Sequence, residues 1–315
     1  MRLQTSVPLQ KDGDSIDYKS KLLLLGSCFA ENIGEKLDYF QFQSLQNPFG
    51  ILYHPLAIEN LVKRALYGKT FQEDEVFEQE GIWYCFEVHS DLRSSERQAL
   101  VKELNEALQT TLEYLQTTTH LIITLGTAWA YRHKSTGNLV ANCHKVPQKE
   151  FSKELLTVKT IKDSLENLVS MIERVNPKLQ IVSTISPVRH LRDGFIENQR
   201  SKANLIFAVH EMENESTVTY FPAYEIMMDE LRDYRFYAKD MVHPNDLAVD
   251  YIWEKFKTVW ISEDSKSTMD DVEAVRKGLQ HRPFNPETDA HQSFLKSLEA
   301  KIAGLQERYP FMKFE

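Results

Sequence analysis

Residues 22–34 read LLLLGSCFAENIG and carry the strongest signal for the fold. The four leucines, Leu22 to Leu25, are too few for a helix and stop at a glycine, so they indicate a buried strand of a parallel sheet. Apolar residues at helical spacing continue to Leu37 and predict a helix directly after the strand. Ser27 and Cys28 occupy the turn between the two. Open α/β sheets bind their ligands at this carboxyl end of the strands.

The same turn begins a helix, whose free N–H groups and dipole stabilise negative charge. Ser27 and Cys28 are therefore the candidate nucleophiles. Cys28 is the stronger candidate, because a helix N-terminus and a neighbouring imidazolium both lower the pKa of a thiol, from ~8.5 to about 4–7. The alternative for Cys28 is a small residue that packs the turn, and for Ser27 it is a hydroxyl that caps the helix.

The composition excludes some classes of protein. The chain has 315 residues, 42% apolar and 26% charged, with a net charge of −9. It lacks the basic character of a general nucleic-acid binder. No apolar run reaches the ~18 residues of a transmembrane helix, and residues 1–11 lack the apolar core of a signal peptide. We therefore expect a cytoplasmic protein without a membrane or nucleic-acid partner. Three cysteines, at positions 28, 85 and 143, are expected to be free thiols.

Further buried strands alternate with amphipathic helices along the chain. The predicted strands are residues 120–125, 179–183 and 218–221, and the main predicted helices are residues 94–117, 160–175, 198–213 and 247–260. This alternation predicts an α/β fold with a parallel sheet of about four or five strands.

The end of the chain has a different character. Residues 262–315 are strongly charged and show only helix patterns, at 267–279 and 286–307. We therefore divide the chain into a domain over residues 1–261 and a C-terminal helical extension over residues 262–315. The extension is expected to cap the domain or to join a partner, and a homo-oligomer is one option.

Four loops are expected to meet at one edge of the sheet. Three follow Leu25, Leu125 and Ile185, and the fourth spans residues 240–245. In the fourth loop, the Asp240 carboxylate can accept a hydrogen bond from one ring nitrogen of His243 and leave the other nitrogen free to take a proton. Considered alone, such a pair is more often part of a solvent-exposed loop. A Gly-Ser-Cys turn on the same edge favours a catalytic role.

Seven blocks of the sequence resemble, in order, the GSCFA domain family. They are Gly26-Ser27-Cys28-Phe29-Ala30, Asn47-Pro48-Phe49-Gly50, His89-Ser90, Gly126-Thr127-Ala128-Trp129, Asn142-Cys143-His144-Lys145, Ser186-Pro187-Val188-Arg189-His190 and Asp240-Met241-Val242-His243-Pro244-Asn245. The resemblance covers about residues 5–255. The first and last blocks also resemble the SGNH (GDSL-like) hydrolases, which implies a three-layer α/β/α, flavodoxin-like sheet with a hydrolase-like site.

The SGNH resemblance places Cys28 on the nucleophile serine and Ser27 on the aspartate before it. The third block departs from Gly-x-Asn-Asp, since Gly126-Thr127-Ala128-Trp129 lacks the asparagine of the oxyanion hole. Losing one such donor costs ~3–4 kcal/mol. The resemblance leaves the backbone N–H groups of Cys28 and Gly50 as oxyanion donors, and Asn47 or Asn142 could replace the missing side chain.

Other polar and aromatic residues are candidates for substrate binding, namely His89, Thr127, Trp129, Asn142, His144 and His190. For His89 and Trp129 a structural role is the stronger alternative. Arg189, His190, Arg192 and Lys202 form either a cationic patch for an anionic substrate or a solvated surface. A zinc site is a weaker alternative, because its candidate ligands lack a metal-binding spacing; these are Cys28, His89, Cys143, His144, Asp240 and His243.

Two functions follow as hypotheses. The first is an enzyme that cleaves or transfers an acyl group at an ester or thioester bond of a small-molecule or carbohydrate-like substrate. Cys28 or Ser27 would attack, His243 would act as base and Asp240 would orient it, with no cofactor. The second is a non-catalytic module that binds an acylated or anionic carbohydrate-like ligand.

Overall fold

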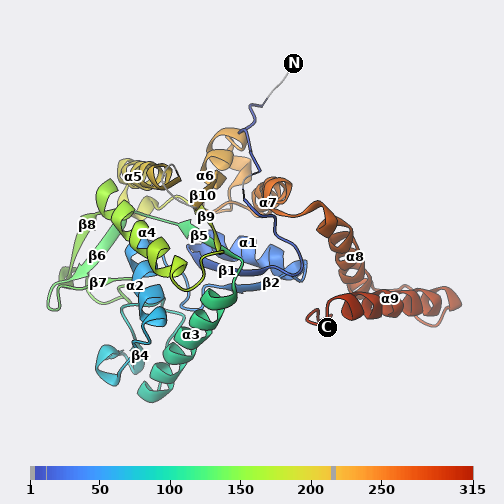
Figure 1. The fold of residues 1–315 in the computed structure, drawn as a ribbon, viewed down its shortest axis with the longest axis horizontal. Coiled ribbons are helices and arrows are strands. Elements are labelled where there is room, and N and C mark those ends of the chain that lie inside the picture. Colours follow the sequence, from blue (N-terminus) through green and yellow to red (C-terminus); the bar gives the residue numbers. More distant parts are fainter. Residues whose placement is uncertain (1–3, 12, 214–217, 315) are drawn as a thin grey trace.

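A five-stranded parallel sheet forms the centre of the computed structural model, which describes residues 4–11, 13–213 and 218–314 (Figure 1). The strands, from one edge to the other, are β10 (Val218–Phe221), β9 (Gln180–Ile185), β5 (His120–Leu125), β1 (Lys21–Gly26) and β2 (Gln43–Gln46). Every neighbouring pair is parallel. If these five strands are numbered 1 to 5 by their order along the chain, their arrangement across the sheet, starting from β2, is 2-1-3-4-5, which is the flavodoxin-like order. The predicted α/β fold is confirmed.

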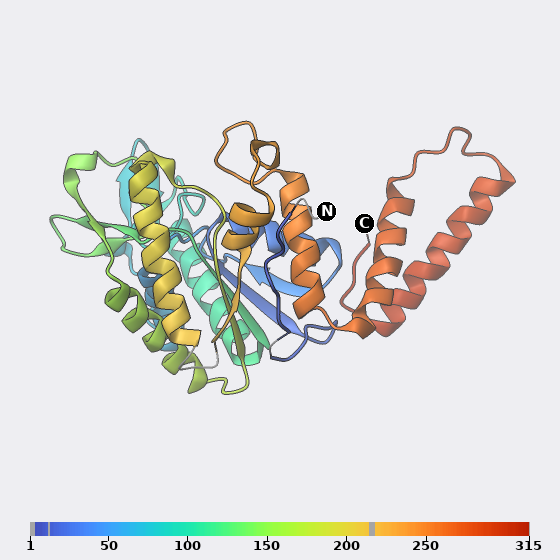
Figure 2. The same cartoon turned by 90° about the horizontal axis from the view of Figure 1, so that it is seen from above.

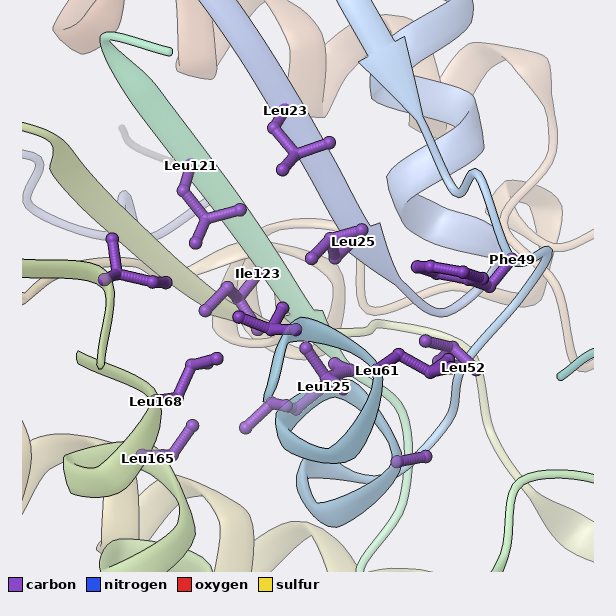
Figure 3. Packing of buried hydrophobic residues seen from close by; sticks show 14 of the residues in the cluster. Leu23, Leu25, Phe49, Leu52, Leu61, Leu121, Ile123, Leu125, Leu165 and Leu168 are labelled. Carbon is purple, nitrogen blue, oxygen red and sulfur yellow. The ribbon is translucent and has the colours of Figure 1, made fainter. Parts of the chain in front are cut away.

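Helices cover both faces of the sheet. One face carries α1 (Cys28–Tyr39) and α7 (Asp246–Trp260), and the other carries α2 (Pro55–Leu66), α3 (Arg97–Thr117), α4 (Val158–Glu173) and α5 (Phe195–Glu213). Successive side chains of a strand point to opposite faces. Leu23 and Leu25 therefore pack in the cluster under α2 and α4 (Figure 3), whereas Leu22 and Leu24 pack in the cluster under α1 and α7.

Burial of β1 explains why four consecutive leucines decide the fold. Leu22 to Leu25 are 0–1% exposed, and burying each side chain stabilises the folded state by about 1.5–3 kcal/mol. The edge strand β2 was not predicted. Its sequence, Gln-Ser-Leu-Gln, is half-buried along its whole length and shows neither an apolar run nor a clear alternation.

The structure also contains two smaller sheets and several short helical turns. A hairpin joins β3 (Phe77–Gln79) to β4 (Ile82–Tyr84), and β6 (Trp129–His133) pairs antiparallel with both β7 (Leu139–Val140) and β8 (Phe151–Leu155). Short helical turns complete the chain: η1 (Glu73–Glu75), η2 (Gln148–Glu150), η3 (Leu191–Asp193), α6 (Ala223–Glu225), the π-helical η4 (Ile226–Glu230) and η5 (Tyr234–Phe236). Strand β8 was not predicted from the sequence.

The C-terminal extension forms an arm of two helices, α8 (Glu263–Gln280) and α9 (Asp289–Arg308), that projects from the α7 side of the domain (Figures 1 and 2). Its base belongs to the same apolar cluster as α7, through Met269 and Val272. The Arg276 guanidinium also donates to the carbonyl of Tyr39 at 2.7 Å. The predicted all-helical character is confirmed, and the domain boundary near residue 262 stays a prediction. In the described part of the chain, no helix is long and apolar enough to cross a membrane.

Candidate functional site

The turn after β1 is fixed by backbone geometry. Gly26 has φ +136°, and a Cβ there would lie 2.1 Å from the carbonyl oxygen of Thr124 on β5. The Gly26 N–H donates to Oδ1 of Asn47, and the Ser27 N–H donates to the Thr124 carbonyl, both at 2.9 Å. Only glycine fits this close approach of two strands. The turn therefore directs the chain into α1 at one defined angle.

Ser27 and Cys28 differ in access. Ser27 is 0% exposed, and its Oγ has no hydrogen-bond partner, so it occupies the N-cap position of α1 without making the expected side-chain cap. Cys28 is the first residue of α1 and is partly exposed. Of the two candidate nucleophiles, Cys28 is thus the one that a substrate can reach.

The expected low pKa of Cys28 is wrong. Burial raises the pKa of this thiol to about 11, and nearby Glu31 raises it further, while Lys202 and the N–H groups of Cys28 and Phe29 oppose the rise. Desolvation disfavours the thiolate more than the helix N-terminus favours it. The thiol is therefore neutral at physiological pH and needs a base to remove its proton when it attacks.

Asp240 and His243 form the hydrogen-bonded pair that their spacing suggests. Nδ1 of His243 lies 2.6 Å from Oδ2 of Asp240, and Oδ1 accepts the N–H groups of Val242 and His243. These bonds, those from His243 first, lower the pKa of Asp240 to about 2. The imidazole is 49% exposed, so its Nε2 is available to an incoming group.

The loop that carries this pair packs against the loop after β9. Arg189 donates from its backbone N–H to the Val242 carbonyl and from its guanidinium to the Met241 carbonyl, and the guanidinium lies over the rings of Tyr234 and Tyr237. Figure 2 shows the chain between η4 and α7 and the start of α5 at the same edge of the sheet. The predicted convergence of these two loops is thus observed.

His190 follows β9 and lies at this edge with its side chain largely buried. Its Nε2 is buried without a hydrogen-bond partner. A Cβ on Gly126 would lie 3.3 Å from that nitrogen and 3.2 Å from the Cβ of Ser27, so the two side chains approach each other over Gly126. Burial lowers the pKa of His190 to about 3, with Lys202 and His243 adding to the effect. The imidazole is therefore neutral, with one nitrogen able to donate and one able to accept.

Cys28 and His243 share this edge but are not hydrogen-bonded to each other. Among the described residues, neither the thiol of Cys28 nor Nε2 of His243 has a hydrogen-bond partner on a side chain. Electrostatic interactions link His243 to His190, His190 to Lys202, and Lys202 to Cys28. Catalytic hydrogen bonds are often long in free enzymes, so the roles of the pair stay predictions.

Lys202 is buried, whereas the sequence analysis placed it on the surface. It is 1% exposed, so it belongs to no surface patch. Its Nζ donates to the carbonyls of Gly126 and Ser186 at 2.8 and 2.7 Å. Burial lowers its pKa to about 7. A signal was present, because Lys202 falls on the buried face of α5 with Asn198, Leu205 and Val209 at helical spacing.

Several expected oxyanion donors are already engaged. The Asn47 amide bonds Gly26 and Glu31, and the Gly50 N–H donates to the Asn47 carbonyl at 2.7 Å. Thr127 Oγ1 bonds Ser201 and accepts the Trp129 N–H, and Asn142 Oδ1 accepts the His144 N–H. The Gly50 N–H is therefore not free for an oxyanion, contrary to expectation. Nor are the side-chain amide of Asn47 and the hydroxyl of Thr127.

His89, Trp129 and His144 are each held by contacts with neighbouring residues. His89 packs against Gly50, where a Cβ would lie 2.4 Å from the His89 Cβ, and its Nδ1 lies 3.1 Å from Oδ2 of Asp91. His144 is buried, its Nε2 is 2.7 Å from the Cys85 carbonyl, and burial lowers its pKa to about 4. Trp129 Nε1 donates to the Glu197 carbonyl at 3.1 Å.

The metal alternative finds no ligand set. Across residues 4–11, 13–213 and 218–314, no three His, Cys, Asp or Glu side chains are grouped as a metal ion would require. The six residues considered for zinc are divided between the turn after β1, the His89–His144 region and the loop at 240–245.

A model described as the GSCFA family matches residues 21–256. The chain belongs to the GSCFA family. A second model, described as the C-terminal domain of GSCFA domain proteins, matches residues 272–315, from within α8 through α9. The predicted resemblance to this family is thus confirmed.

No curated protein matches the chain. Among solved structures, a carbohydrate esterase of family 3 from Talaromyces cellulolyticus matches with 9% identity and a TM-score of 0.35, over 80% of this chain and 99% of the esterase chain.

Proposed function

We propose that this GSCFA protein is an acyl-transfer enzyme of the hydrolase type, which cleaves an ester or thioester through an acyl intermediate on Cys28. One arrangement carries the proposal. A partly exposed thiol begins α1 on the same edge of the sheet as an Asp–His pair whose outer nitrogen is free. Such a nucleophile, base and orienting acid are the parts that covalent acyl transfer requires.

The proposed reaction has two steps. In the first, the Cys28 sulfur forms a bond to the acyl carbon while its proton passes to a second base at this edge, and the bond to the leaving oxygen or sulfur breaks as that atom takes the proton of protonated His243. In the second, the now neutral His243 removes a proton from water, whose oxygen bonds to the acyl carbon; the bond from that carbon to sulfur breaks, the sulfur takes its proton back from the second base, and the acid is released. Asp240 holds Nδ1 of His243 throughout, so that Nε2 faces the reacting groups.

Negative charge on the acyl oxygen needs donors that replace the missing asparagine. The N–H groups of Cys28 and Phe29 at the start of α1 lower the pKa of the Cys28 thiol and so favour negative charge there, and the helix dipole adds to them. Neutral His190 supplies a third candidate, because its buried Nε2 has no partner in the structure. A neutral imidazole can donate one hydrogen bond to such an oxygen.

Trapping the intermediate tests this function. Incubation with p-nitrophenyl acetate at pH 8, followed by acid quench and peptide mass spectrometry, is expected to place one acetyl group on the peptide that contains Cys28. Cys143, which is also partly exposed with a pKa raised to about 11 by burial, is the internal control and should stay unmodified. Acetylation of both cysteines to the same extent, or of neither, would contradict a nucleophilic role for Cys28.

A second candidate function is a binding module for an acylated or anionic carbohydrate-like ligand. Two observations favour it, namely the raised pKa of Cys28 and the absence of a hydrogen bond between the described side chains of Cys28 and His243. The same trapping experiment separates the two functions, since a binding module forms no adduct and releases no p-nitrophenol.

Asp240 provides a quantitative test of the proposed pair. We expect Asp240→Asn to lower turnover of p-nitrophenyl acetate by about 10²-fold or more, because the amide cannot hold His243 in the required tautomer. Since the pKa of Asp240 is lowered to about 2, its carboxylate stays charged as the pH falls through 4, so the acid limb of the wild-type rate profile should not report this residue. Arg235 pairs with Asp233 in the adjoining turn, and Asp233→Asn is the matched control that should keep its activity.

A further inference from the structure

Lys202 is buried in an unusual way. It is 1% exposed, and no carboxylate in the described part of the chain forms an ion pair with it. Lysines are almost never fully buried unless they are paired, since an unpaired ammonium loses its hydration and gains no counter-charge. A methionine would fill the same space without that cost, so stability does not explain a lysine here.

The hydrogen bonds of Lys202 fit a neutral amine. Nζ has two acceptors, the carbonyl oxygens of Gly126 and Ser186. An ammonium group has three N–H donors, so one would be left buried without an acceptor. A neutral amine has two N–H donors, which these carbonyls satisfy, and a lone pair that can take a proton. The amine is thus held by the carbonyls of the two residues that directly follow β5 and β9.

The two carbonyls place the amine at the same edge of the sheet as the candidate nucleophile. Lys202 interacts electrostatically with Cys28, and its positive charge acts to lower the pKa of the thiol. Ser27, the neighbour of Cys28, packs against Gly126, and its buried hydroxyl has no hydrogen-bond partner. Because the Ser27 hydroxyl bonds neither the thiol nor the amine, a bridging water molecule is needed to carry a proton between them.

We propose that Lys202 is the internal proton acceptor for Cys28. When the Cys28 sulfur forms its new bond, the thiol proton passes through one water molecule to Nζ, which becomes an ammonium and returns the proton to the sulfur when the acyl group leaves. This inference deepens the proposed function. It keeps Cys28 as nucleophile, takes the first proton transfer away from the exposed His243, and leaves to His243 the proton of the leaving group.

The charges around the pair are consistent with this direction of transfer. Burial lowers the pKa of Lys202 to about 7 and raises that of Cys28 to about 11, so both are neutral at pH 8. Glu31 on α1 disfavours the thiolate, as does the phenol of Tyr53 when ionised. Two groups act on Lys202 itself: His190 interacts with it electrostatically, and Nζ lies 5.7 Å from the centre of the Tyr224 ring. A base with a pKa near the working pH is the most effective in general-base catalysis.

The test needs no substrate. Iodoacetamide alkylation of each cysteine is followed by peptide mass spectrometry between pH 6 and 10, in the wild type, Lys202→Gln and Lys202→Arg. In the wild type, Cys28 should react about tenfold or more faster than Cys143 at pH 8, with a rise centred near pH 7. Both variants should lose this advantage, because glutamine has no basic lone pair and arginine stays protonated. Cys143 should react alike in all three proteins, and Lys159→Gln, a variant of an exposed lysine on α4, should match the wild type.

The outcomes separate the two proposals. Equal reactivity of Cys28 in the wild type and both folded variants would overturn the role of Lys202, even if Cys28 forms an acyl intermediate. A wild-type advantage that the variants lose would support Lys202, even if no ester is hydrolysed. If the variants fail to fold, the wild type still decides, since Cys28 and Cys143 with equal rates and no rise near pH 7 would also overturn the proposal.

Discussion

Cys28→Ala should reduce turnover of p-nitrophenyl acetate by about 10³-fold or more while the protein stays folded. Removing the nucleophile of a covalent mechanism leaves only the contribution of binding and oxyanion stabilisation. The side chain lies at the first position of α1 and is partly exposed, so its loss opens no large cavity. We expect the melting temperature to change by a few degrees at most, as measured by calorimetry.

Cys143→Ala is the matched control, because the same atom is removed from another partly exposed cysteine. It should keep wild-type turnover. Cys28→Ser distinguishes the requirement for sulfur from the requirement for any nucleophile, and a small residual activity is expected there. Wild-type turnover in folded Cys28→Ala would exclude Cys28 as the nucleophile.

The largest effect on stability is expected from Gly26→Ala. The new methyl group would lie 2.1 Å from the Thr124 carbonyl oxygen and 2.8 Å from the carbonyl carbon, in a residue with φ +136°. Both neighbours are backbone atoms of a central strand and cannot move without breaking the β1–β5 ladder. We expect a loss of more than ~4 kcal/mol in the free energy of unfolding, the range of severe core defects. Urea denaturation followed by circular dichroism measures it.

Gly137→Ala separates steric overlap from backbone strain. Gly137 also has a positive φ, +73°, but a Cβ there would meet nothing within 4 Å. Its substitution should cost only the ~1–2 kcal/mol of the left-handed conformation. If both variants lose the same amount of stability, the contact with Thr124 does not determine the requirement for glycine at position 26.

Much of the fold follows from local sequence. The leucines of β1 and the apolar run of β5 indicate strands that are buried on both faces, because a continuous apolar run has no solvent side. Alternation of such strands with amphipathic helices then leaves few topologies. Strands with polar sequences were missed, as β2 and β8 show. Both pair through backbone hydrogen bonds, which leave no pattern in the side chains.

Part of the candidate site, like part of the fold, follows from local sequence. The sequence by itself determined the Asp240–His243 pair, whose three-residue spacing suffices to form the hydrogen bond within one loop. It also determined that Ser27 and Cys28 begin a helix after a strand. These features depend on neighbours in the chain, so no distant residue is needed to form them.

The tertiary structure alone decided the electrostatics. Whether Cys28 has a lowered or a raised pKa depends on how much protein surrounds the thiol, and burial raises it. Whether Lys202 is solvated or buried depends on which face of α5 meets the sheet, and that face brings Nζ to the carbonyls of Gly126 and Ser186. Desolvation is a property of the packed molecule, because it sums over residues that are far apart in sequence.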